Sequence, residues 1–184
     1  MREREAFQEF DLGAVFGSMS KWASTIDDAQ RVPELISRAF YTATSGRPGP
    51  IVLGLPRDML DEAVGSADAP PCIPVETAPG ETEMGQFYEA LLRAKRPIFI
   101  LGGSRWNEAA WQTIQDFAAR FAVPVATSYR RLPLFDPLHR SYAGDLGIAP
   151  NPKLVAAIKS ADLIVALGGR LGDIPSQGYA LFDI

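Results

Sequence analysis

Three places along the sequence combine glycine, hydroxyl or arginine residues in a way that could bind a phosphate group. Each follows a short apolar run: Gly102-Gly103 after the first, Thr127-Ser128 after the second and Gly168-Gly169-Arg170 after the third. Glycine lets a phosphate approach backbone N–H groups, and an arginine can pair with the anion. The alternative is that these glycines only turn the chain. The sequence contains no G-x-G-x-x-G or Walker loop, so the usual NAD and ATP signatures are absent.

Side chains that perform acid–base or nucleophilic catalysis are scarce. His139 is the only histidine and Cys72 the only cysteine. These counts exclude a multi-histidine metal centre, a cysteine-based zinc site and an internal disulfide, and they disfavour a Ser-His-Asp triad. We therefore assign no metal ligands. Such a composition suits an enzyme whose cofactor performs the difficult chemistry, and it suits a non-catalytic domain equally well.

Helices that alternate with short apolar strands must position the glycine-rich ends. This alternation is typical of an α/β fold, a parallel sheet with helices on both faces, in which ligands bind at the carboxyl ends of the strands. A long proline-containing loop is expected over residues 128–152. The apolar patterns predict helices at 84–92, 106–121 and 153–160 and strands at 97–101, 123–126 and 163–167.

A partial α/β domain precedes this sheet. Apolar residues at helical spacing predict a helix over residues 32–43, and residues 51–55 form an apolar run that predicts a short buried strand. Residues 61–80 are rich in proline, alanine and glycine, which is typical of an extended linker. We therefore predict a partial domain over 1–60, this linker, and a Rossmann-like domain over 81–184 that is truncated at its C-terminal end.

The composition is that of a packed globular chain. Of the 184 residues, 47% are hydrophobic and 22% are charged, and the net charge is −4. This balance gives no reason to expect nucleic-acid binding. No apolar run reaches the roughly 20 residues that span a bilayer, and the charged residues 1–10 do not form a signal peptide. We expect a cytoplasmic protein without a nucleic-acid or membrane partner.

Four stretches together carry a family resemblance. They are E-A-F-Q-E at 5–9 with M-S-K-W at 19–22, S-G-R-P-G-P-I-V-L at 45–53, R-P through G-G at 96–103, and A-D-L-I-V through G-G-R at 161–170. In combination they resemble the large subunit of acetolactate synthase and its thiamine-diphosphate relatives, over nearly the whole chain. The resemblance implies that residues 1–60 end a pyrimidine-binding domain and that residues 81–184 form most of a central domain.

The resemblance also implies two groups of site residues. Phe7, Gln8 and Lys21 match positions near the thiazolium ring and the substrate, where Gln8 and Lys21 would orient the acceptor. The alternatives are a core aromatic for Phe7 and solvated side chains for the other two. The second group matches positions where acetolactate synthases contact FAD, and related enzymes other adenine nucleotides: Gly102, Gly103, Ser128, Leu146, Gly147, Gly168 and Arg170.

Several positions depart from the family pattern. Trp22 stands where acetolactate synthases usually have histidine, Ala149 replaces another histidine, and Ile174 replaces an arginine. An FAD site, a site for another adenine nucleotide and an empty crevice therefore all remain open. The family's activating glutamate and its G-D-G…N motif, which holds the diphosphate through Mg²⁺, are absent from this sequence. Gly144-Asp145-Leu146 and Gly172-Asp173-Ile174 only look like that motif.

These observations predict a fragment of an enzyme that uses thiamine diphosphate and Mg²⁺. The whole enzyme would be a 2-oxo-acid carboligase or decarboxylase, a transferase or lyase, and this chain alone would be inactive. We also expect a homo-oligomer, because family active sites lie between two chains. The alternative is a non-catalytic nucleotide-binding or assembly module.

Overall fold

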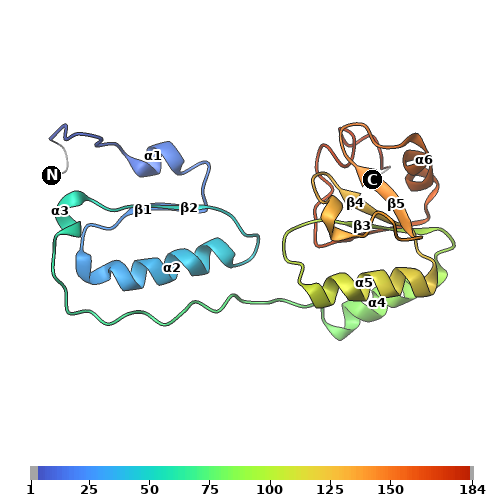
Figure 1. The fold of residues 1–184 in the computed structure, drawn as a ribbon, viewed down its shortest axis with the longest axis horizontal. Helices are drawn as coiled ribbons and strands as arrows, with labels where there is room; N and C mark the ends of the chain where they lie inside the picture. Colours follow the sequence, from blue (N-terminus) through green and yellow to red (C-terminus); the bar gives the residue numbers. More distant parts are fainter. Residues whose placement is uncertain (1–3, 183–184) are drawn as a thin grey trace. The chain divides into compact units, whose positions relative to one another are not determined.

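The computed structural model describes residues 4–182, and the chain divides by its contacts into two compact units, Met1–Ala78 and Pro79–Ile184. The first unit contains α1 (Leu12–Phe16), β1 (Trp22–Thr25), η1 (Ala29–Arg31), α2 (Val32–Thr44), β2 (Ile51–Gly54) and α3 (Arg57–Leu60) (Figure 1). The second contains α4 (Glu81–Arg93), β3 (Pro97–Leu101), α5 (Glu108–Phe121), β4 (Val125–Ser128), η2 (Leu132–Leu134), β5 (Tyr142–Leu146), α6 (Pro152–Ser160) and β6 (Leu163–Leu167). No helix within residues 4–182 combines the length and the apolar character needed to cross a bilayer.

The first unit holds a two-stranded parallel sheet. β1 pairs with β2 in a register that runs from Trp22 opposite Ile51 to Thr25 opposite Gly54. The predicted helix at 32–43 is confirmed as α2, and the predicted strand at 51–55 as β2. The prediction that this strand is buried is wrong, because each of its residues is only half-buried beside a single partner strand.

Strand β1 was not predicted from the sequence. Its four residues, Trp-Ala-Ser-Thr, include two small polar side chains and no apolar run, so the usual strand signal is missing. The strand forms because it adds to β2, and Ile26, directly after it, is fully buried. Ile26 packs in one core with Leu35 of α2 and Met59 of α3, so the short elements share a single apolar centre.

The second unit is a four-stranded parallel sheet with the order β5-β4-β3-β6. The three strands predicted from apolar runs are neighbours in this sheet, since β3 lies between β4 and β6. From β3 the chain first moves outward through β4 to β5, and then returns to place β6 on the other side of β3. The strand order therefore reverses between β3 and β6.

Both faces of this sheet are covered, which confirms the predicted fold class. In Figure 1, α4 and α5 lie on one face and α6 on the other. Alternate residues of β3 point to the two sides: Phe99 packs in one core with Ile114 of α5, and Ile100 packs in the other with Ile158 of α6. Because the central strands are buried on both faces, they are apolar without alternation, and this made them visible in the sequence.

The prediction of a long loop over residues 128–152 is wrong in part. It contains η2 and the edge strand β5. The sequence of β5, Tyr-Ala-Gly-Asp-Leu, has few strand-forming residues. Gly144 adopts a φ of +125°, and the pairing with β4 shifts register beside it. An irregular edge strand of this kind leaves no periodic apolar signal.

Two predicted boundaries also move. Helix α5 begins at Glu108 rather than 106, because Asn107 caps it with a side-chain oxygen that accepts the Ala110 N–H at 2.8 Å. Trp106 therefore lies in the loop before the helix. Strand β4 covers 125–128 rather than 123–126, since Pro124 has no N–H to donate to a ladder.

Asp162 joins the amino-terminal ends of β3 and β6. Its carboxylate accepts the backbone N–H groups of Lys95 and Arg96, each at 2.8 Å, and the Arg96 Nε donates to the Ser160 carbonyl at 2.7 Å. The R-P and A-D motifs thus meet in space and fix the register in which Pro97 lies opposite Leu163. The two backbone donors lower the pKa of the Asp162 carboxyl.

We predict that Asp162→Ala lowers the thermal unfolding midpoint, because two N–H groups beside β3 lose their acceptor. Since the pKa of Asp162 is lower in the folded state, its contribution is fully present above the ordinary aspartate value of 3.8 and is lost as the pH falls through the folded value. The difference in midpoint between wild type and variant should therefore be constant from neutral pH to about 5 and close only in stronger acid. Calorimetry across this range measures it, with Asp116→Ala on α5 as the control. A difference that is equally large in strong acid would contradict the assignment.

Candidate functional site

The reversal of strand order between β3 and β6 defines a topological switch point. In open parallel sheets, ligands bind in the crevice outside the carboxyl ends of the strands at such a point. Gly102-Gly103 directly follows β3, and Gly168-Gly169 directly follows β6. The structure therefore brings both predicted glycine pairs to the place where this fold offers a ligand site.

The two glycine pairs also pack against each other. A Cβ atom added to Gly103 would lie 1.8 Å from the Gly168 carbonyl oxygen, and one added to Gly102 would lie 2.9 Å from the Gly169 Cα. Gly103 and Gly168 both have φ near +70°, a conformation that favours glycine. The close approach of the two loops is therefore sufficient to explain glycine here, as the turning alternative proposed. Gly168 and Gly169 are exposed at this point, whereas Gly102 is buried and its N–H donates to the Leu167 carbonyl at 2.9 Å.

Trp106 borders the same point and was not among the predicted site residues. Its indole Nε1–H donates to the Gly102 carbonyl at 2.6 Å, and a Cβ added to Gly168 would lie 3.0 Å from Nε1. The sequence predicted Trp106 as a helix residue, and no local pattern indicated that it would turn toward the glycines. Its ring now forms an apolar wall of the switch point.

Three further predicted residues lie on the neighbouring strands. Ser128 ends β4, and its Cβ would lie 3.5 Å from a Cβ added to Gly102, so it adjoins the switch point. Leu146 pairs with Ser128 and is fully buried in the core, so it could meet a ligand only through its backbone. Gly147 follows, half-buried beside Tyr129 and the Asp145 carboxylate.

Arginines supply the positive charge at this edge. Arg170 is exposed on the loop after β6, directly behind the second glycine pair. Arg130, on the loop after β4, has a φ of +58° and holds its guanidinium 5.0 Å from the centre of the Tyr129 ring. A cation–π contact of this kind restricts the side chain. Two strand ends therefore present cations, as an anionic ligand requires.

A buried polar group lies beneath this edge. Thr127 is fully buried, its hydroxyl donates to the Asp145 carboxylate at 3.3 Å, and the Tyr142 hydroxyl lies 3.5 Å away. Burial raises the pKa of Asp145. Within residues 4–182 no group of three or more histidine, cysteine, aspartate or glutamate residues could hold a metal ion. The contact that the structure shows for the Asp145 carboxylate is the hydrogen bond from Thr127.

The other group of predicted residues lies in the first unit. Phe7 is 93% exposed, and Gln8 is exposed with a φ of +62°; both lie in the segment before α1. Lys21 donates from Nζ to the carbonyls of Thr42 and Ser45, at 2.5 and 2.7 Å, at the end of α2. Its ammonium group thus satisfies carbonyls that the helix leaves without partners.

The contacts of Lys21 also connect two of the sequence motifs. The Lys21 N–H donates to the Pro50 carbonyl at 2.8 Å, and a Cβ on Gly49 would lie 3.1 Å from the lysine stem. Next to it, the Trp22 ring packs on the core, and the Arg38 guanidinium carbon lies over that ring, 4.6 Å from its centroid. A tryptophan at the position of the family histidine is therefore explained by packing.

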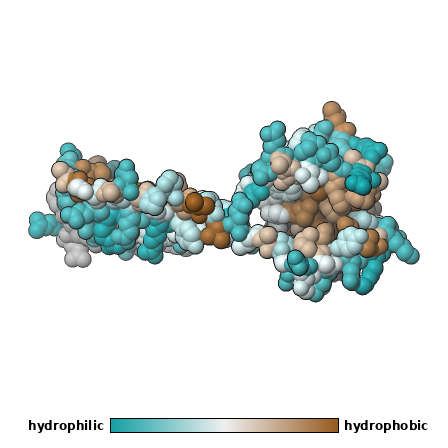
Figure 2. Space-filling view, turned by 90° about the horizontal axis from the view of Figure 1, so that it is seen from below, coloured by the Kyte–Doolittle hydropathy of each residue, from teal (hydrophilic) through white to brown (hydrophobic). Residues whose placement is uncertain are grey.

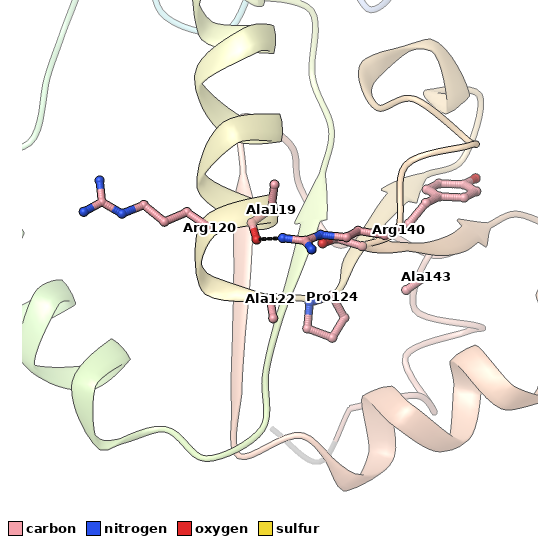
Figure 3. Close-up of a pocket in the computed structure, with 8 residues that line it drawn as sticks. Ala119, Arg120, Ala122, Pro124, Arg140 and Ala143 are labelled. Carbon is pink, nitrogen blue, oxygen red and sulfur yellow. Dashed lines mark hydrogen bonds between the residues drawn. The ribbon is translucent and has the colours of Figure 1, made fainter.

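An open hollow of about 400 Å³ lies at the opposite edge of the sheet, beside the amino ends of β4 and β5 (Figure 3). Arg140 in it donates to the Ala119 carbonyl, and the Ser141 hydroxyl to that of Ala118, so both serve the end of α5. In Figure 3 the Arg120 side chain points away from the others. None of the predicted site residues lines this hollow.

Comparison with known proteins agrees with this architecture. Residues 84–183 match the model of the thiamine pyrophosphate enzyme central domain. The acetolactate synthase large subunit of Corynebacterium glutamicum is 28% identical over 174 residues, which are 92% of this chain and 28% of that protein. Isozyme 3 of the same subunit in Escherichia coli is 27% identical over 97% of the chain and 32% of that protein. A glyoxylate carboligase of Escherichia coli O157:H7 is 30% identical over 92% of the chain and 29% of that protein.

This chain therefore spans about a third or less of the length of the curated relatives that it matches. The match to the central-domain model covers more than half of its residues, and the parallel sheet with two covered faces lies within the matched region. The protein belongs to the thiamine pyrophosphate enzyme family.

Proposed function

We propose that this chain is part of a thiamine-diphosphate-dependent enzyme that acts on 2-oxo acids, as a carboligase or decarboxylase. The observation that carries the proposal is the similarity to acetolactate synthases and to a glyoxylate carboligase over more than nine-tenths of the chain. Glyoxylate is itself a 2-oxo acid. Acetolactate formation from pyruvate is the nearest named reaction, although Trp22 in place of histidine argues for a different acceptor.

The described residues do not by themselves fit a complete cofactor site. Thiamine diphosphate supplies the carbon nucleophile in this family, and the protein must hold its diphosphate, usually through Mg²⁺. Among residues 4–182 no cluster of metal-ligating side chains is present, and the Lys21 ammonium group is bonded to α2. We therefore assign the activating and metal-binding groups to other parts of the whole protein.

Phe7 and Gln8 are the residues of this chain best placed to meet a substrate. Both are exposed on a segment without helix or strand. An exposed phenylalanine is costly in water unless another surface covers it. We propose that a second chain of the oligomer, or another domain of the same chain, covers this segment and completes the acceptor site there.

A second candidate function is the binding of an adenine nucleotide, FAD or another, at the switch point. Its support is that Gly102, Gly103, Gly168 and Ser128 lie together there, with Arg170 on the adjoining loop. The absence of cations at Ala149 and Ile174, both exposed, argues for a ligand with fewer anionic contacts than FAD makes in the family. An empty crevice is the remaining alternative.

The proposed division of labour predicts that the chain 1–184 is inactive. Purified protein with thiamine diphosphate, Mg²⁺ and either pyruvate or glyoxylate should release no CO₂ above a buffer blank, because positioned groups for the cofactor are lacking. An acetolactate synthase assayed in parallel is the control. The longest natural reading frame that contains this chain should, in contrast, release CO₂ only when both cofactors are added. Turnover by the short chain that survives a second purification would refute the division, and an inactive long product would refute the proposed function.

Arg170 tests the nucleotide site. A charge-assisted hydrogen bond to phosphate contributes about 1.5–3 kcal/mol, so Arg170→Ala should weaken FAD or ADP binding about ten- to a hundred-fold. Isothermal titration of both nucleotides into the wild type and the variant measures the change. Arg120→Ala, at the opposite edge of the sheet, is the matched control. Equal affinities would remove Arg170 from the site, and no binding to the wild type would favour the empty crevice.

Lys21 separates a structural role from a role in orienting the acceptor. Lys21→Met keeps the stem against Gly49 but leaves the carbonyls of Thr42 and Ser45 to water, so we expect a loss of about 1 kcal/mol in the stability of the first unit. Urea unfolding followed by tryptophan fluorescence in a Trp106→Phe/Trp111→Phe background, in which only Trp22 remains, reports it, and Lys153→Met on α6 is the control. In the protein made from the long reading frame, the same variant should lower the free energy of unfolding and leave the KM for the acceptor unchanged. The reverse result would return Lys21 to the active site.

A further inference from the structure

Asp145 differs from most acidic side chains of the second unit. Figure 2 shows mostly hydrophilic residues around the outside of that unit and hydrophobic ones towards its middle, as is usual in a packed domain. Asp145 is instead half-buried, near the carboxyl end of the edge strand β5. Burial raises the pKa of its carboxyl group, and no lysine or arginine within residues 4–182 forms an ion pair with it. Desolvating a carboxylate without a cation is costly, and such groups gather at functional sites.

Two hydroxyl groups hold this carboxylate in one orientation. Thr127 is fully buried and lies opposite Asp145 in the pairing of β4 with β5. Its hydroxyl donates to Oδ1 of Asp145 at 3.3 Å, and the Tyr142 hydroxyl lies 3.5 Å from the Thr127 oxygen. Because an ionised carboxylate only accepts hydrogen bonds, Thr127 donates to Asp145 and is left to accept from Tyr142. The Asp145 side chain is therefore fixed before any ligand binds.

The second carboxylate oxygen, Oδ2, is left uncovered at the end of the strand. It lies 2.8 Å from the position that a Cβ atom on Gly147 would take, so any other residue there would collide with it. Among residues 4–182 no group donates a hydrogen bond to Oδ2. The nearby Arg130 guanidinium lies over the Tyr129 ring instead. One oxygen of a fixed carboxylate is thus available to a donor from outside the chain.

The place of Asp145 along the sheet edge selects the kind of group that it can meet. β5 lies two strands from β3 in the order β5-β4-β3-β6, which is about 10 Å at roughly 4.8 Å per strand. The glycine pairs and Arg170 suit an anion, whereas a carboxylate repels one. A nucleotide that lies across the strand ends therefore has its phosphates at β3 and β6 and a neutral hydrogen-bond donor at β5. The hydroxyl groups of its ribose are donors of this kind.

We propose that Asp145 determines the specificity of the candidate nucleotide site, by accepting a hydrogen bond from a ribose hydroxyl group and by excluding a phosphate from the same place. The family resemblance assigned site roles to Leu146 and Gly147 beside it and none to Asp145. The proposal rests on the second candidate function, nucleotide binding at the switch point, and is independent of the carboligase reaction.

Removal of the ribose hydroxyl groups tests the hydrogen bond without any change to the protein. In isothermal titration of the chain 1–184, ADP should bind about ten- to a hundred-fold more tightly than 2′,3′-dideoxy-ADP, because a hydrogen bond to a charged group is lost. Equal affinities for the two ligands would overturn the role of Asp145 and leave the nucleotide site standing. If ADP does not bind at all, the nucleotide site itself is refuted, and the proposal falls with it.

Removal of the charge separates recognition from a structural role. Asp145→Asn keeps an oxygen that can accept from Thr127, and it should weaken ADP binding about ten-fold, because the charge-assisted bond becomes a neutral one. The same variant should bind adenosine 2′,5′-bisphosphate or adenosine 3′,5′-bisphosphate about ten-fold more tightly than wild type does, since the repelling charge is gone. Asp116→Asn, exposed on α5, is the matched control and should change neither affinity. If Asp145→Asn weakens every ligand alike, Asp145 serves only the fold, and the proposal is overturned.

Discussion

The pairing of β3 with β6 is the constraint on which the second unit depends. It closes a sheet in which the chain has already placed β4 and β5 on one side, and it is fixed at both ends by different chemistry. At the amino ends, the Asp162 carboxylate binds two consecutive backbone N–H groups. At the carboxyl ends, two glycine pairs approach so closely that any side chain would collide. The switch point therefore exists because backbone meets backbone there.

This construction limits what the candidate site can do. Gly168 and Gly169 are exposed, whereas Gly102 is buried, its N–H bonded to the Leu167 carbonyl and its carbonyl to the Trp106 indole. The positive charge comes from exposed arginines and not from a buried cation. Such a site suits an anion that lies across the strand ends better than a ligand that must be enclosed. The open hollow at the opposite edge has its polar groups engaged by α5 and adds no second site.

In the first unit, residues of the sequence motifs make contacts that stabilise the fold. Lys21 and the Gly46–Pro50 turn are far apart in the sequence, yet the lysine stem and backbone lie against that turn. Its ammonium group donates to the Ser45 carbonyl at the end of α2, and the Arg38 guanidinium lies over the ring of the adjacent Trp22. The resemblance to acetolactate synthases matches positions without by itself assigning their chemistry, because a matched residue can serve the fold as well as the substrate.

The sequence by itself determined the fold class, the family resemblance and the elements with strong periodicity. α4, α6, β3 and β6 were predicted within three residues because strands buried on both faces and helices with one apolar side leave clear patterns. Strands β1 and β5 were missed, since Trp-Ala-Ser-Thr and Tyr-Ala-Gly-Asp-Leu become strands only by pairing with a neighbour. Tertiary structure alone decided that Trp106 turns toward Gly102, that Lys21 faces α2, and that the half-buried Asp145 lies against the buried Thr127. Each of these contacts joins residues through the folded backbone, and local sequence carries no signal for a partner that only folding brings near.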